Sequence, residues 1–247
     1  MKKIIILCLF VITPLYLFAQ NNLYRAVYNG DINYIQRYIN NFNDNSEEHE
    51  YFSSNNDLRL LRNTIYAMHG YRFRSRDLLE HFNKFSWYNG TKDNVENELN
   101  EKERRLIRVI LAMEQVNPPS PNDIIGFWTI PVSASVEHIG FMDLRINTDG
   151  TISGFMNGLW SLEGTTFYTR RTDSGHNFLP PGLGQLGTVE NLRIIVFELN
   201  GRLYQTIDFF GAYPESASRR RHWYRREDLR SLINAWGLRE DHYIYPF

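Results

Sequence analysis

The pattern of apolar and polar residues divides the chain into a helical part and a β part. Between residues 22 and 116, apolar side chains recur every three or four positions, which is typical of amphipathic helices. After residue 123 they alternate with polar side chains, as in residues 142–146 (MDLRI), which is typical of half-buried strands. Residues 117–121 (NPPSP) separate the two parts, because successive prolines cannot continue a helix. The pattern predicts an α+β protein.

The first helical segment, residues 22–42, is expected to form a helical hairpin. Asn29, Gly30 and Asp31 interrupt its apolar periodicity, as a helix end followed by an N-cap does. The segment resembles a single ankyrin-type unit, which cannot bury its own apolar face. We therefore expect the hairpin to dock on the helices that follow, after a polar, acidic linker over residues 43–50.

The second segment, residues 51–116, is expected to contain three helices. Asp57 is expected to cap the first helix, from Leu58 to His69, and Gly70 to end it in the left-handed conformation. Ser75 is expected to cap the second helix and Asn100 the third. The apolar stripe of the first helix consists of Leu58, Leu61, Ile65 and Met68.

Residues 123–213 predict an antiparallel β domain. Asn200-Gly201 supplies the two positive φ values of a type I′ hairpin turn, and residues 179–187 form a Pro/Gly-rich loop. We expect six to eight antiparallel strands in a barrel or a sandwich. Residues 214–247 are expected to add a basic connector, a helix from Arg226 to Trp236, and an aromatic tail.

Residues 62–70 (RNTIYAMHG), followed by Trp87-Tyr88, resemble the motif that names the YARHG domain family. Further residues match in order, and the resemblance covers about residues 55–116. The family is extracytoplasmic and bacterial, so the resemblance implies the same address, and it implies no particular reaction. The chain has Met68 at the position where the family name has Arg. This position therefore supplies no guanidinium for binding an anion or a carboxylate. The other matching positions are Leu61, Phe73, Leu78 and Phe82.

The motif allows a structural and a functional interpretation. Arg62, Tyr66 and His69 share one helix face. In the structural interpretation they form a helical corner in which Trp87 packs on Tyr66 and Arg62 donates to Asp77 or to carbonyls at the turn. In the functional interpretation, a recognition surface binds an envelope glycan, peptide or protein. The residues of that surface are Arg62, Tyr66, His69, Trp87 and Tyr88.

Residues 1–19 have the pattern of a secretory signal peptide. Lys2 and Lys3 precede an apolar stretch that ends near Ala19, where we expect cleavage. About 15 mostly apolar residues, interrupted by Pro14, are few for a membrane span, which needs about 20. Cys8 lies too early to carry a lipid at the cleavage site. We therefore expect a periplasmic or secreted protein that is not a lipoprotein. After cleavage the chain is not expected to span the membrane. An uncleaved membrane anchor is the alternative.

The mature chain would contain no cysteine and hence no disulfide. Loss of Lys2 and Lys3 leaves 25 basic residues against 28 acidic ones, which gives no reason to expect nucleic acid or an anionic membrane as partner. The basic and aromatic residues 219–226 are followed at once by acids. We interpret them as a solvated connector that pairs with nearby acids, with an anionic cell-wall polymer or a lipid headgroup as the alternative ligand.

No sequence motif indicates a metal, a cofactor or a nucleophile. His69 and His81 lie on different predicted helices, and the chain contains no G-x-S-x-G, His-x-x-x-His or phosphate-binding glycine loop. We therefore expect no cofactor, no metal and a non-catalytic binding or envelope-associated role.

Two other functions stay open. One is a hydrolase of envelope polymers with Glu, Asp and His drawn from the β domain, because the separation of paired carboxylates is set only in space. The other is a carrier of a small apolar ligand in the β domain, since Gly126-Phe127-Trp128 weakly resembles the start of lipocalin-type barrels.

Overall fold

The computed structural model describes residues 22–42, 54–133, 139–154, 157–172, 188–207, 209 and 223–235. The chain divides into two compact units between Leu111 and Ala112. The expected signal peptide, the acidic linker, the Pro/Gly-rich loop and the aromatic tail lie outside the described residues. The described helices of the first part are α2 (Asn22–Asn29), α3 (Ile32–Asn41), α4 (Asn55–Met68), α5 (Arg76–Phe82), the 3₁₀ helix η2 (Glu96–Glu98) and α6 (Glu101–Val116).

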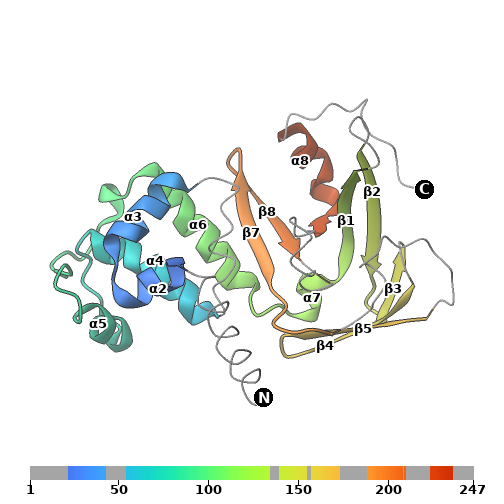
Figure 1. Cartoon of the computed structure of the whole chain (residues 1–247), viewed down its shortest axis with the longest axis horizontal. Helices are drawn as coiled ribbons and strands as arrows, with labels where there is room; N and C mark the ends of the chain where they lie inside the picture. Colours follow the sequence, from blue (N-terminus) through green and yellow to red (C-terminus); the bar gives the residue numbers. More distant parts are fainter. Residues whose placement is uncertain are drawn as a thin grey trace, which may run out of the picture. The chain divides into compact units, whose positions relative to one another are not determined.

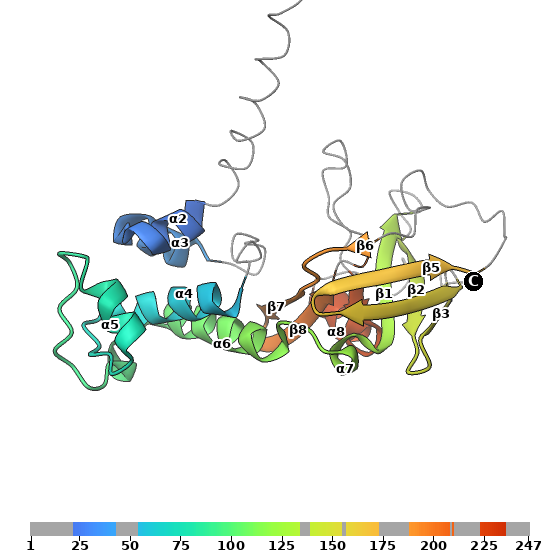
Figure 2. The same cartoon turned by 90° about the horizontal axis from the view of Figure 1, so that it is seen from below.

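Helices α2 and α3 form the expected hairpin, and the hairpin packs on α4 (Figure 2). Gly30 takes a φ of +70° between the two helices, and Asp31 caps α3 by accepting a hydrogen bond of 3.0 Å from the Tyr34 amide. The Tyr28 hydroxyl donates to the Asp57 carboxylate of α4 over 2.5 Å. The apolar side of the hairpin is buried by this packing, through Leu23, Val27, Ile35 and Ile39.

Helix α4 begins three residues earlier than the sequence pattern predicts. The cap is Ser54, whose hydroxyl accepts a hydrogen bond of 3.2 Å from the Asp57 amide, so the expectation that Asp57 caps the helix is wrong. Asp57 instead lies in the first turn, where a carboxylate is stabilised by the helix dipole and here also accepts from Tyr28. The end of the helix is as expected, with Gly70 at a φ of +80°.

The second and third predicted helix starts are confirmed. Ser75 precedes α5. At the start of α6, the Asn100 side-chain oxygen accepts from the Glu103 amide over 3.0 Å, and the Glu103 carboxylate accepts from the Asn100 amide over 2.8 Å. This reciprocal pair is a capping box, which satisfies two amides that the helix itself leaves without partners.

The second unit contains one antiparallel sheet of nine described strands (Figure 1), which confirms the α+β class. The strand order is β6-β5-β4-β3-β2-β1-β9-β8-β7. The described sheet is open, with β6 and β7 at its two ends, so it does not close into a barrel and the lipocalin resemblance stays unconfirmed. The strands are β1 (Gly126–Ser133), β2 (Ile139–Ile146), β3 (Thr151–Gly154), β4 (Gly158–Glu163), β5 (Thr166–Arg171), β6 (Thr188–Val189), β7 (Ile194–Leu199), β8 (Arg202–Ile207) and β9 (Trp223–Arg225).

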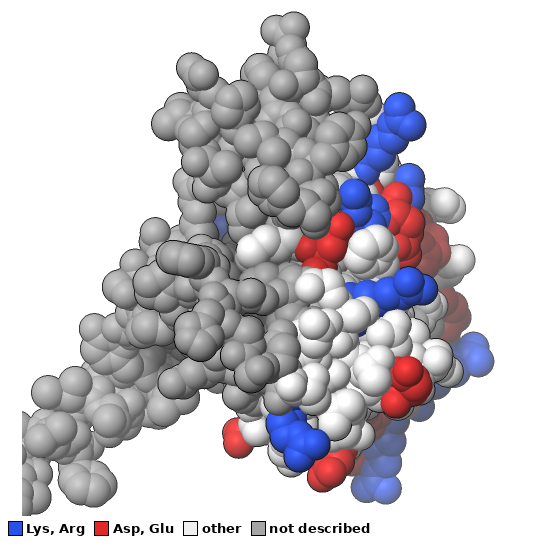
Figure 3. All heavy atoms as spheres, turned by 90° about the vertical axis from the view of Figure 1, so that its right-hand side faces the viewer, with Lys and Arg blue, Asp and Glu red and all other residues white. Residues whose placement is uncertain are grey.

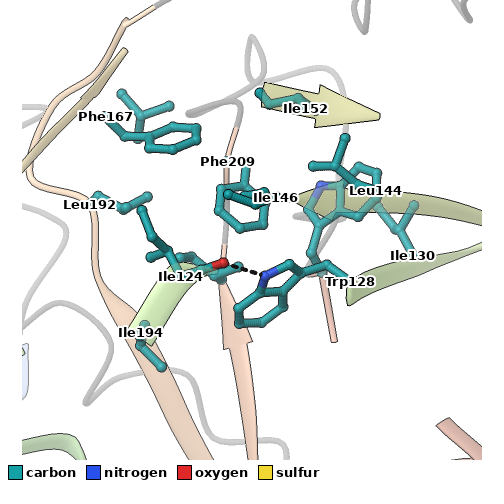
Figure 4. Close-up of a cluster of buried hydrophobic side chains, with 13 residues drawn as sticks. Ile124, Trp128, Ile130, Leu144, Ile146, Ile152, Phe167, Leu192, Ile194 and Phe209 are labelled. Atoms are coloured by element: carbon teal, nitrogen blue, oxygen red, sulfur yellow. Dashed lines mark hydrogen bonds between the residues drawn. The ribbon is translucent and has the colours of Figure 1, made fainter. Parts of the chain in front are cut away.

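The sheet curves around one apolar core. Figures 1 and 2 show β4 and β5 running across the direction of β1 and β2, so distant strands face the same interior. Phe209 lies at the centre, with its ring 5.3 Å from the rings of both Trp128 and Phe167. The Trp128 indole N–H donates to the Ile124 carbonyl over 2.8 Å (Figure 4). Large side chains therefore fill the interior of the described sheet.

Arg225 of β9 accounts for the glycine and the tryptophan of the Gly126-Phe127-Trp128 segment. The Arg225 guanidinium lies 4.0 Å from the centre of the Trp128 ring and donates to the carbonyls of Ile125 (2.9 Å) and Asp123. A Cβ atom on Gly126 would clash with this guanidinium, and the φ of Gly126 is +143°. Glycine is required here because the arginine occupies the space of a side chain.

The basic and aromatic segment at residues 219–226 is only partly described by the structure. Residues 219–222 lie outside the described residues, while Arg225 binds carbonyls and Arg226 lies 3.5 Å from Asp143. On the described part of the face in Figure 3, basic and acidic residues are interspersed.

The helix predicted from Arg226 to Trp236 is divided into the 3₁₀ helix η3 (Arg226–Asp228) and α8 (Leu229–Ala235). Trp236 lies outside the described residues. Helix α8 contacts β8 where the Tyr204 hydroxyl bonds to Ser231 over 3.2 Å.

Asn117 joins the end of α6 to the edge strand β7. Its buried amide donates to the carbonyls of Met113 (2.9 Å) and Ile194 (2.7 Å), and its oxygen accepts from the Ile194 amide over 2.9 Å. The side chain therefore satisfies both backbone groups of Ile194, as a neighbouring strand does.

We predict that Asn117→Ala lowers the free energy of unfolding by about 2–4 kcal/mol, because buried backbone groups lose their partners. Chemical denaturation of the mature chain measures this change. Asn122→Ala, at an exposed position of α7 (Pro121–Ile124), is the control and is expected to shift stability by less than about 0.5 kcal/mol. Equal midpoints for the two variants would contradict the structural role of Asn117.

Candidate functional site

A half-open pocket of about 360 Å³ lies beside α4 in the helical unit. One wall is a face of α4, and the other is the segment at residues 93–96 before and within η2. Its volume falls in the range of roughly 300–1,000 Å³ that small-ligand sites occupy. The lining residues are mostly polar: Arg62, Asn63, Tyr66, Tyr71, Asp93, Asn94, Val95 and Glu96.

Backbone pairing after Gly70 places the second wall against α4. Tyr71 and Lys92 form a parallel bridge, and the Arg72 amide donates to the Lys92 carbonyl over 2.7 Å. The Gly70 carbonyl accepts from the amides of Thr91 (3.1 Å) and Lys92 (3.0 Å). Gly70 is needed for this turn, because its φ is +80° and a Cβ atom would lie 3.0 Å from the Asn89 carbonyl oxygen.

The turn at Asn94 sets the direction of the second wall. The Asn94 side-chain oxygen accepts from the Glu96 amide over 2.8 Å, which is an Asx turn. Val95 is buried and anchors the turn, while Glu96 is exposed on the pocket side. The carboxylate of Glu96 consequently lies close enough to the Tyr66 hydroxyl to interact with it.

Tyr66 contributes a protonated hydroxyl to the pocket. Burial, and next the charge of the Glu96 carboxylate that interacts with the hydroxyl, raise the pKa of Tyr66, while Arg62 acts in the opposite direction. The Tyr66 ring lies 6.0 Å from the Tyr71 ring, at an angle of 54°. At neutral pH the hydroxyl is therefore a hydrogen-bond donor and an acceptor, and not an anion.

Asp93 is held in its ionised form by Arg72. The guanidinium contacts both carboxylate oxygens, at 2.6 and 2.7 Å, and its hydrogen bonds hold the pKa of Asp93 below the ordinary value. Because the pair is exposed, its main effect is to fix the geometry of the second wall rather than to stabilise the fold.

His69 lies at the end of α4 but belongs to the packing of the helices. Its Nε2 lies 3.0 Å from Oε1 of Glu103, whose side chain is 2% exposed and also serves the capping box of α6. His69 does not line the pocket.

Trp87 and Tyr88 also belong to the packing of the helical unit and do not line the pocket. Trp87 stacks on Phe85, with ring centres 5.5 Å apart, and donates to the Gly30 carbonyl of the hairpin over 2.9 Å. The Tyr88 hydroxyl donates to the Tyr71 carbonyl over 2.9 Å. These bonds tie the segment after α5 to the hairpin and to the turn after Gly70.

Two details of the expected helical corner differ in the structure. Trp87 was expected to pack on Tyr66, but its ring contacts Phe82, Phe85 and Tyr88. Asp77 was expected as a partner of Arg62, but Arg59, one turn earlier on α4, binds it over 2.5 Å.

The structure thus brings two of the five candidate residues, Arg62 and Tyr66, to the pocket and places the other three in the packing around it. The lining residues 93–96 were missed, because they belong to a segment without apolar periodicity. A readable signal was Asp93-Asn94, a pair typical of Asx turns.

The site offers hydrogen bonding and charge. Among the described residues, no group of three or more His, Cys, Asp or Glu side chains is placed to hold a metal ion. The pocket combines one guanidinium, two carboxylates, two amides and two phenols, which are groups that bind a polar ligand.

Comparison with known proteins identifies a domain at this place in the chain. Residues 32–115 match the family model of the YARHG domain, which confirms the resemblance. The match begins at α3 and includes both walls of the pocket. No curated protein and no solved structure matches the chain.

The YARHG domain is an extracytoplasmic module. No helix in the described part of the chain has both the length and the apolar character to cross a membrane.

We predict that Trp87→Ala lowers the free energy of unfolding by about 2–4 kcal/mol, because the stack on Phe85 and the bond to Gly30 are lost. Tyr66→Phe removes a hydroxyl that lines the pocket and interacts with the exposed Glu96, and it is expected to change stability by less than about 1 kcal/mol. Urea denaturation followed by circular dichroism compares the two. An unchanged midpoint for Trp87→Ala would instead assign that residue to a recognition surface.

Proposed function

We propose that this chain is an exported, non-catalytic binding protein of the bacterial cell envelope, whose YARHG domain holds a polar ligand in the pocket beside α4. The observation that carries the proposal is the pocket itself. Arg62 and Tyr66 of the family motif face residues 93–96 across about 360 Å³, and the volume and the converging polar groups fit a small ligand.

Export is supported by two independent observations. Lys2 and Lys3, the apolar stretch and Ala19 have the order of a signal peptide, and the YARHG domain is an extracytoplasmic module. We infer cleavage near Ala19 and a periplasmic or secreted mature protein.

The protonation states of two pocket residues, Asp93 and Tyr66, are unsuited to catalysis of hydrolysis by these two residues. A hydrolase of glycans needs a carboxylic acid whose pKa is raised so that it can donate a proton. Arg72 lowers the pKa of Asp93, so this carboxylate stays ionised and is unsuited to that role. Tyr66 has a raised pKa and stays protonated, so it is unsuited to act as a base.

The pocket is also better supported as a ligand site than the β unit. An apolar carrier needs an internal cavity, whereas Trp128, Phe167 and Phe209 fill the interior of the described sheet.

We predict that the pocket retains a small ligand from an envelope extract. The mature chain is incubated with the extract, separated by size exclusion and analysed by mass spectrometry for small molecules that stay bound. The double variant Arg62→Ala/Tyr66→Phe is expected to retain at least about tenfold less, since it removes charge and hydrogen bonds from one wall.

The matched control is Tyr34→Phe/Arg37→Ala, which changes the same residue types on α3, outside the pocket. It is expected to retain as much ligand as the unaltered chain. Equal retention by all three proteins would refute the pocket, and no retention by any of them would refute the binding function.

A further inference from the structure

The turn of the α2–α3 hairpin rests on a row of aromatic rings. The Trp87 indole donates to the Gly30 carbonyl over 2.9 Å and stacks on Phe85, with ring centres 5.5 Å apart. Phe85 lies so close to Gly30 that a Cβ atom on this glycine would clash with the Phe85 ring. The His81 ring of α5 lies 5.2 Å from the Phe85 ring, at an angle of 79°. His81, Phe85 and Trp87 together form what we call the aromatic seat of the hairpin.

His81 is the member of the aromatic seat that titrates near neutral pH. Its ring lies 6.2 Å from the Tyr28 ring of α2, at an angle of 85°, and it has a hydrogen bond to the backbone of Val27. The Nε2 atom of His81 is buried and has no hydrogen-bond partner. One ring nitrogen is therefore bonded to the hairpin, while the other has no acceptor.

A neutral imidazole suits this position and an imidazolium does not. In the neutral ring only one nitrogen carries a proton, so the ring needs only one acceptor. Protonation of Nε2 would place a second N–H and a charge where the protein offers no acceptor. Burial first, and next the positive charge of Lys84, lower the pKa of His81, while the bond to the Val27 backbone acts in the opposite direction.

The titratable groups around the seat do not compensate an imidazolium. Lys84, after the end of α5, repels it. On α2, burial and next the interaction with Asp57 raise the pKa of Tyr28, so its hydroxyl stays neutral, and Tyr24 contributes only another ring beside it. The Asp57 carboxylate of α4 accepts from Tyr28 over 2.5 Å.

The other acids of the hairpin and of α5 are engaged elsewhere. Asp31 caps α3, and Asp77 and Glu80 are bound to arginines. Among the residues that the structure describes, no carboxylate forms a hydrogen bond or an ion pair with His81. Protonation therefore has to be accommodated by a change in the packing between α2 and α5.

We propose that the aromatic seat is an acid-sensitive latch, in which protonation of His81 weakens the docking of the α2–α3 hairpin. The docked hairpin favours the neutral ring, so the stabilisation by His81 is complete above the pKa of a free histidine, about 6.5. It is lost as the pH falls through that value and through the lower pKa of the docked state. This inference concerns regulation and does not depend on the proposed binding function of the pocket.

Undocking would uncover the apolar side of the hairpin. The residues of this side are fully buried in the docked state: Leu23, Val27, Ile35 and Ile39. The latch thus gives the helical unit a state, favoured by acid, in which an apolar surface becomes accessible.

The test is amide hydrogen exchange of the mature chain at about pH 7.5 and about pH 5, expressed as protection factors so that the intrinsic pH dependence of exchange is removed. The amides of Val27, Ile35 and Ile39 are expected to lose at least about fivefold of their protection at the lower pH, since each unit of pKa difference is a factor of ten. The amides of Leu144 and Ile146 in β2, in the other compact unit, are expected to change by less than about twofold.

Variants separate His81 from general acid effects. His81→Gln and His81→Phe cannot be protonated, so each is expected to hold hairpin protection constant within about twofold between the two pH values, whatever its own stability. Lys84→Gln, at an exposed position, removes the repulsion and is expected to raise the pKa of His81 and to reduce the loss of protection.

An NMR titration of the His81 ring in the unaltered chain makes the test independent of how the variants fold. A pKa below about 6.5 supports the latch. A pKa at or above that value would show that the surrounding rings stabilise the cation, and it would overturn the inference. A loss of hairpin protection that persists in both His81 variants, or that is equally large in β2, would overturn it as well.

Discussion

The arrangement of the helical unit depends on the buried carboxylate of Glu103. This side chain is 2% exposed, yet it lies 3.0 Å from Nε2 of His69 and accepts from the Asn100 amide over 2.8 Å. A buried carboxylate is tolerated only when it is hydrogen-bonded or paired. Glu103 therefore joins the end of α4 to the start of α6 and closes the segment between them into a loop. Closure of this loop reduces the number of conformations that the second pocket wall, at residues 93–96, can adopt.

The YARHG motif separates into residues that build this loop and residues that face the pocket. His69, Gly70 and Trp87 hold the loop through Glu103, a left-handed turn and the Gly30 carbonyl. Arg62 and Tyr66 lie earlier on α4, on the face that the loop covers. The fold residues thus position the second wall against Arg62 and Tyr66, in keeping with the structural interpretation of the motif, while the functional interpretation stays a prediction.

The sequence predicted those features that depend on local chemistry. Asn200-Gly201 has positive φ values of 51° and 78°, and Gly70 ends α4, because these positions need conformations that few residues tolerate. The α+β class followed from periodicity, but the open sheet did not, since curvature and closure depend on strand register. The start of α4 was missed because Ser54 follows a polar stretch without periodicity. The second pocket wall was missed because Tyr71 and Lys92 meet only through tertiary pairing.

A double-mutant cycle on His69 and Glu103 tests the central claim most directly. The free energy of unfolding is measured for His69→Ala, Glu103→Gln and the double variant. A structural bond between the two side chains predicts that the double variant loses less than the sum of the single losses, by about 1 kcal/mol or more. Additive losses, within about 0.3–0.5 kcal/mol, would show that His69 does not stabilise Glu103 and would contradict the account.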